Sequence, residues 1–194
     1  MKPPFDISGD LNTPVSAYLK LAPFRPRFLL ESVAGGERLG RYSFIGFGDA
    51  LDIKLDANGL SLDGRRLPAP VNGAELLAVL RAALAAAPRP QPDCAGVPLS
   101  GGLVGYASFD IVRLFERLPS HRPAGGTPLL HYVAPASLLV FDHVTHAIAL
   151  LHAGPEHERA ALRQEVSRAL QGGLPKRRAS RGFSAAGQDH VARV

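Results

Sequence analysis

Alternating apolar and polar positions predict strands along the first third of the chain. Residues 27–33 and 41–47 each have the pattern of a strand, and residues 51–55 alternate strictly. The sequence DANG at 56–59 is a strong hairpin signal, and residues 60–62 return from it. We expect these segments to form consecutive antiparallel strands.

A helical period replaces the alternation at other places. Thr13 followed by Pro14 predicts a cap and a short helix, and Pro155 predicts a helix that ends before Gly172. A third helix is predicted over residues 73–87, where the apolar residues Leu76, Leu77, Leu80, Ala83 and Leu84 share one face.

Shorter elements complete the predicted pattern. Residues 102–107 and 137–141 read as strands, and residues 146–151 return from a turn at 142–145. Residues 110–118 predict a compact helix with Ile111, Leu114 and Phe115 facing inward. The fold class that follows is α+β, rich in antiparallel sheet, with about three substantial helices.

The composition is that of a globular protein, with 46% apolar and 20% charged residues among 194. The single cysteine, Cys94, excludes a disulfide framework and a cysteine-based zinc site. No apolar run approaches the length of a membrane span, and the N-terminus lacks the apolar core of a signal peptide. We therefore expect a cytoplasmic protein that is not bound to a membrane.

The net charge of +5 is confined to the last part of the chain. Residues 159–194 hold 8 Lys and Arg against 2 Asp and Glu, whereas residues 1–158 are nearly balanced. A nucleic-acid-binding surface needs a basic stripe on the folded body. The pattern favours a solvated basic linker and no nucleic-acid partner.

Histidines and glycines offer two candidate sites that we interpret as structural. His143 and His146 are three residues apart in a predicted turn, which does not suit the converging ligands of a zinc site. The glycines at 101–105 lack the lysine and hydroxyl of a phosphate-binding loop, so close backbone packing is the better interpretation.

A polar pair, Glu31 and Ser32, interrupts an apolar strand. Both side chains accept hydrogen bonds and could receive an ammonium group. The alternative is a solvent-facing glutamate on an edge strand with the serine turned inward. In the polar stretch that follows, Arg38 and Arg41 could hold an anion, or pair with Glu31 and Glu37.

Four blocks together closely resemble the N-terminal region of anthranilate synthase component I. The first is PVSAYLKL at 14–21, and the second joins LLES at 29–32 to GGERLGRYSFIG at 35–46. The third is GGLVGY at 101–106 with DIVR and ERLP after it, and the fourth is LLVFDH at 138–143. The blocks follow one another in the family's order.

The resemblance implies a regulatory N-terminal domain over residues 1–171, and a linker over 172–194 that leads to a C-terminal domain outside this chain. The full enzyme converts chorismate and an amino donor to anthranilate and pyruvate with Mg²⁺, and a glutamine amidotransferase subunit supplies the ammonia. The catalytic residues and magnesium carboxylates lie in that further domain, so the present chain is expected to be inactive and to bind no metal.

The same resemblance places Glu31 and Ser32 in one wall of the site where L-tryptophan inhibits the enzyme. It also implies that this sheet is half of a β-sandwich, and that the strands at 27–33, 41–47 and 137–141 expose an apolar face without the other half. Two alternatives stay open. One is the corresponding part of aminodeoxychorismate synthase in folate synthesis, and the other is a separate amino-acid-sensing module.

Overall fold

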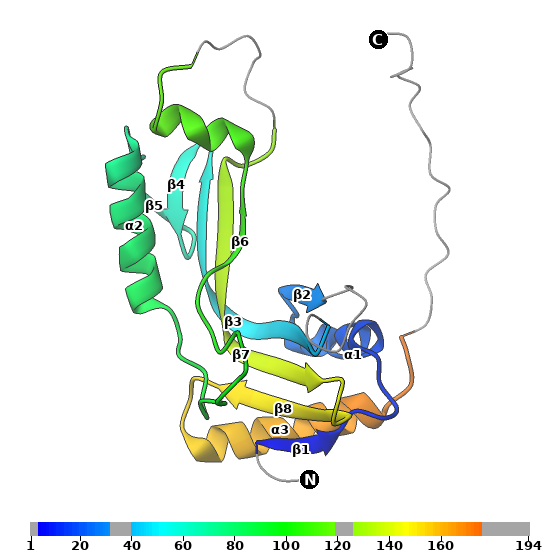
Figure 1. The fold of residues 1–194 in the computed structure, drawn as a ribbon. Coiled ribbons are helices and arrows are strands. Elements are labelled where there is room, and N and C mark those ends of the chain that lie inside the picture. The colour runs from blue at the N-terminus through cyan, green and yellow to red at the C-terminus, as the bar shows by residue number, and fades with distance from the viewer. Residues whose placement is uncertain (1–3, 32–39, 119–125, 176–194) are drawn as a thin grey trace, which may run out of the picture.

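Two long antiparallel strands, β3 (Tyr42–Asp56) and β7 (Leu130–Asp142), form the centre of one eight-stranded sheet (Figure 1). The computed structural model describes residues 4–31, 40–118 and 126–175. In this part of the chain the remaining elements are β1 (Phe5–Ser8), α1 (Pro14–Lys20), η1 (Ala22–Phe24), β2 (Phe28–Glu31), β4 (Gly59–Leu62), β5 (Arg65–Leu67), α2 (Gly73–Ala86), β6 (Val104–Ala107), η2 (Phe109–Leu114), β8 (Ala147–His152) and α3 (Glu156–Gln171).

The two central strands carry different neighbours along their two halves. The sheet order is β1-β8-β7-β3-β4-β5, while β2 pairs with the first half of β3 and β6 with the first half of β7. All of these pairs are antiparallel. The predicted α+β class with a sheet-rich fold and three main helices is confirmed.

The sheet bends where the register of β3 against β7 shifts between Phe47 and Ala50. Gly48 has a φ of +81°, a conformation that glycine adopts at little cost and that suits a bulge. The prediction of separate strands at 41–47 and 51–55 is therefore wrong. The polar, glycine-containing stretch between them is a bulge inside one continuous strand.

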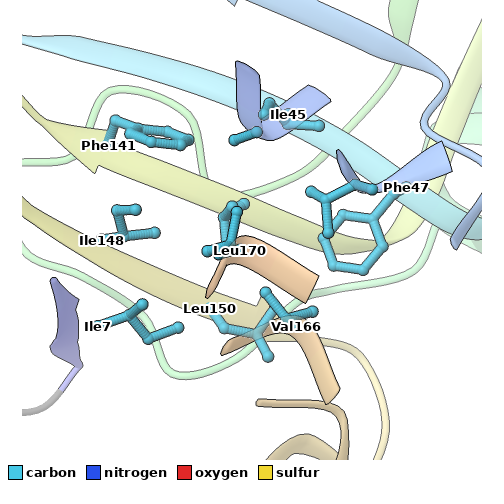
Figure 2. Close-up of a cluster of buried hydrophobic side chains, with 11 residues drawn as sticks. Ile7, Ile45, Phe47, Phe141, Ile148, Leu150, Val166 and Leu170 are labelled. Carbon is cyan, nitrogen blue, oxygen red and sulfur yellow. The ribbon is translucent and has the colours of Figure 1, made fainter. Parts of the chain in front are cut away.

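Helices α1 and α3 cover one face of the half of the sheet that contains β1, β8 and β2 (Figure 1). Figure 2 shows Ile45 and Phe47 of β3 and Phe141 of β7 beside α3's Val166 and Leu170. The helix predicted from Thr13 is α1, whose Ser16 amide donates to the Thr13 hydroxyl at 3.1 Å. The helix predicted after Pro155 is α3.

The opposite face of this half is also covered by the chain itself. Phe44, Leu138 and Val140 are buried there against Cys94 and neighbouring residues of the proline-rich segment that follows α2. The expectation that strands 41–47 and 137–141 expose a large apolar face is therefore wrong. The segment that the sequence indicated only as a loop supplies the missing cover.

Helix α2 packs against the other half of the sheet. It begins at a side-chain cap, where Asn72 accepts a hydrogen bond from the Glu75 amide at 2.9 Å. Leu76 and Ala83 are buried as predicted, but Leu77 and Leu84 are exposed because the buried stripe is narrower than the predicted face.

The compact helix predicted at 110–118 is the shorter 3₁₀ helix η2. Its Ile111 and Leu114 join the apolar cluster beneath α2 as predicted, whereas Phe115 is half exposed and lies against Gly73 at the start of α2. No helix in the described ranges is both long and apolar enough to cross a membrane.

Candidate functional site

The candidate site lies where β2 ends beside the beginning of β3. Glu31, the last residue of β2, is the register partner of Ser43 on β3. Its side chain is exposed, and no hydrogen bond or ion pair joins it to another described residue. Ser32, the other predicted ligand-binding residue, lies outside the described residues, as do residues 33–39.

Ser43 itself faces the interior and has a partner distant in sequence. It is only 2% exposed, and its hydroxyl lies 2.8 Å from Nε2 of His143 in the turn between β7 and β8. The His143 ring stacks on Phe141, with 6.4 Å between the ring centroids. The main-chain amide of His143 donates to the Arg41 carbonyl at 2.9 Å.

Arg41 is held by Asp142 at the same end of the sheet. Its guanidinium donates to both carboxylate oxygens of Asp142, at 3.1 and 2.8 Å, in a two-pronged pair. The guanidinium also lies 4.9 Å from the Tyr42 ring centroid. Of the alternatives given for Arg41, pairing with Glu31 is wrong, because Asp142 is the partner.

The Asp142 carboxylate is buried, with only 4% of the residue's surface exposed, and it is nevertheless ionised. Burial acts to raise the pKa of Asp142, but hydrogen bonds from Arg41 and from the Val144 amide outweigh it. The net result is a pKa below the usual value for aspartate. The pair therefore keeps its charges at neutral pH.

A polar hollow of about 470 Å³ adjoins these residues. It lies between the segment from β1 to α1 and the turn from β7 to β8, and its polar lining includes Asp10, Asn12, Thr13, Asp142, His143 and His146. Its walls are tied together by the Gly9 amide, which donates to the His146 carbonyl at 2.9 Å. Asp142 and His143 thus line a hollow that water can reach.

The other candidates from the sequence are structural in this fold. In the described part of the chain, no group of three or more His, Cys, Asp and Glu residues is placed to hold a metal ion. His143 and His146 lie in the predicted turn. A side chain on Gly105 would collide with the His131 carbonyl, so the glycine-rich segment serves close backbone packing, as predicted.

Sequence comparison decides the family. No family model matches the chain. It is 40% identical over 170 residues to anthranilate synthase component 1 of Thermus thermophilus, a match that covers 86% of this chain and 35% of the relative. The Pseudomonas aeruginosa anthranilate synthase component 1 is 38% identical over 167 residues, covering 80% of this chain and 32% of that protein. The chain is a homologue of the N-terminal part of anthranilate synthase component 1.

The match covers only part of the length of these relatives. The chain spans about a third of the length of the curated relatives that it matches. A solved structure of anthranilate synthase component I from Streptococcus pneumoniae matches with a TM-score of 0.55 and 22% identity, over 87% of this chain and 37% of that chain. That likeness shows a shared fold. The resemblance seen in the four sequence blocks is thereby confirmed.

Three residues of the site were missed by reading the sequence. Ser43 and His143 lie within blocks that carry the resemblance, and Asp142 lies beside His143, but nothing local pairs them. Ser43 and His143 are 100 positions apart, so no local pattern in the sequence indicates their contact. Glu31 is exposed at the end of β2, which agrees with both the ligand-binding interpretation and the alternative of a solvent-facing glutamate on an edge strand.

Proposed function

We propose that this chain is the regulatory N-terminal domain of an anthranilate synthase component I of the cytoplasm, and that it binds L-tryptophan as a feedback inhibitor. The observation that carries the proposal is the 40% identity to the Thermus thermophilus enzyme over 86% of the chain. The exposed Glu31 carboxylate at the end of β2 supports a ligand site in the same region.

Glu31 and Ser32 are the proposed tryptophan-binding residues. The ammonium group of an amino acid needs hydrogen-bond acceptors, and a carboxylate next to a hydroxyl provides two. Among the described residues, none forms a hydrogen bond or an ion pair with the Glu31 carboxylate. The rest of the pocket belongs to the two thirds of the relatives that this chain does not match.

The chemistry of the reaction is assigned to that other part. In the full enzyme we propose the conversion of chorismate and ammonia to anthranilate and pyruvate, with Mg²⁺ and with a glutamine amidotransferase subunit as the source of ammonia. The described residues offer no group of three or more potential ligands that fits a metal ion. The magnesium ligands and the catalytic residues are proposed to belong to that other part.

A chimera tests the proposal. Residues 1–171 of this chain would replace the matching N-terminal third of the Thermus thermophilus relative, and anthranilate would be followed by its fluorescence with chorismate, ammonia and Mg²⁺. We expect the chimera to form anthranilate and to be inhibited by L-tryptophan, whereas the 194-residue chain alone forms none. L-Phenylalanine at the same concentration is the specificity control and should inhibit the chimera much less than L-tryptophan does. An active chimera that is insensitive to tryptophan contradicts the regulatory assignment.

A further inference from the structure

Ser43 links the candidate ligand site at the end of β2 to His143 in the turn between β7 and β8. Its main chain is the register partner of Glu31, and its side chain is bonded to His143 at 2.8 Å. The residue that places the end of β2 is thus itself placed by the turn between β7 and β8. This connection depends only on described residues.

The contact belongs to a cross-linked set that we name the strand-end lock: Arg41, Ser43, Asp142 and His143. The two prongs of Arg41 to Asp142, the His143 amide to the Arg41 carbonyl, and Ser43 to His143 together join the start of β3 to the end of β7. The Val144 amide donates to Asp142 at 3.0 Å and fixes the turn. The lock leaves little freedom in where Ser43 lies.

The end of β2 has few other supports. β2 has only four residues, and among the described strands it pairs only with β3. A strand this short is not stable by itself. Its position is therefore set by the strand with which it pairs. Glu31 at its tip is exposed, so packing does not fix its position.

We propose that Ser43 and His143 are positioning residues for the amino-acid site, holding the tip of β2 in the geometry that receives the ligand. Neither residue touches the ligand in this account. The inference rests on the proposed function, since it names how the tryptophan site at Glu31 is set. The polar hollow beside His143 gives solvent access to this support.

The chain contains a matched control for this proposal. Ser137 on β7 is also 2% exposed, and its hydroxyl lies 2.9 Å from Nδ1 of His152. This second serine–histidine pair lies opposite Phe47, at the bend of the sheet and away from the tip of β2. Losing either pair removes one part-buried hydrogen bond of a buried serine, but only Ser43 is the register partner of Glu31.

The experiment compares Ser43→Ala and Ser137→Ala in the chimera. The readout is the L-tryptophan concentration for half-inhibition, with each rate expressed relative to the same variant without tryptophan. We expect Ser43→Ala and His143→Ala to raise it by about 2- to 30-fold, and Ser137→Ala to leave it unchanged. His143→Gln can restore a hydrogen bond at the Nε2 position and should recover much of the sensitivity.

Hydrogen exchange on the 194-residue chain gives a second readout that needs no tryptophan. The amides of β2 should exchange faster in Ser43→Ala than in Ser137→Ala. The positioning role is wrong if the two serine substitutions change the half-inhibition concentration equally, or if His143→Gln recovers no sensitivity. Either result leaves the proposed function intact. If tryptophan fails to inhibit the unsubstituted chimera, the proposed function fails and this inference falls with it.

Discussion

The buried hydroxyl of Ser43 lies 2.8 Å from Nε2 of His143, and 100 residues separate the two along the chain. The contact joins the beginning of β3 to the turn after β7, next to the tip of β2. The positioning role proposed for Ser43 makes the candidate ligand site depend on this long-range contact as well as on the local sequence around Glu31. This dependence yields predictions about stability as well as about ligand binding.

The first prediction concerns the two serine–histidine pairs. Ser43→Ala and Ser137→Ala should each lower the free energy of unfolding by about 0.5–1.5 kcal/mol, because each variant loses one part-buried hydrogen bond between a serine hydroxyl and a histidine ring. Urea unfolding of the 194-residue chain measures both. Ser61→Ala is the control, since Ser61 makes only a long 3.5 Å bond to the Lys54 carbonyl. A control loss as large as the other two contradicts the account.

The second prediction concerns the close approach of β6 to β7. A Cβ on Gly105 would collide with the His131 carbonyl and lie 2.7 Å from Cα of Tyr132, and both are main-chain atoms that cannot rotate away. We expect Gly105→Ala to destabilise the fold by about 1–3 kcal/mol or more. Gly173→Ala is the control, because nothing lies within 4 Å of its added methyl group. Thermal unfolding with no difference between the two variants would argue against this packing.

The third prediction concerns acid sensitivity. The folded-state pKa of Asp142 lies below its usual value near 4, so the ionised pair with Arg41 stabilises the fold at pH values above that range. This stabilisation is lost as the pH falls through the folded pKa. Asp142→Asn should therefore lower the free energy of unfolding at pH 7, and the difference from the unsubstituted chain should shrink below pH 4. A difference that grows on acidification contradicts this sign.

The fourth prediction concerns the cap of α2. Asn72→Ala removes the acceptor of the Glu75 amide and should cost about 0.5–2 kcal/mol of stability. Asn72→Asp keeps a cap acceptor and should cost much less. Circular dichroism during thermal unfolding distinguishes the two, and equal losses would show that the cap has no special role.

Local signals in the sequence predicted the elements that local chemistry determines. Thr13 before Pro14 marked α1, Pro155 marked α3, and Asn58 with Gly59 marked the hairpin between β3 and β4. Each of these depends on a cap or a turn within a few residues. The resemblance to anthranilate synthase component I likewise depended on contiguous blocks.

The sequence did not predict features that depend on distant segments. The bulge at Gly48 made one strand look like two, and Pro135 obscured the first half of β7, which pairs with β3 and β6. β1 and β5 are short and were not predicted at all. For Arg41 the sequence suggested either an anion or a nearby glutamate as the partner, whereas the sheet brings Asp142 to it from 101 residues away.

The measurement that tests the central claim most directly is tryptophan inhibition of the chimera with Ser32→Leu. The leucine removes a hydroxyl proposed to bind the ammonium group and replaces it with a larger apolar side chain. A hydrogen bond to a charged group is worth about 1.5–3 kcal/mol, so half-inhibition should require roughly 10- to 150-fold more L-tryptophan. Ser137→Ala, distant from the tip of β2, should be inhibited like the unsubstituted chimera. If Ser32→Leu is inhibited as readily as the unsubstituted chimera, this strand does not carry the tryptophan site.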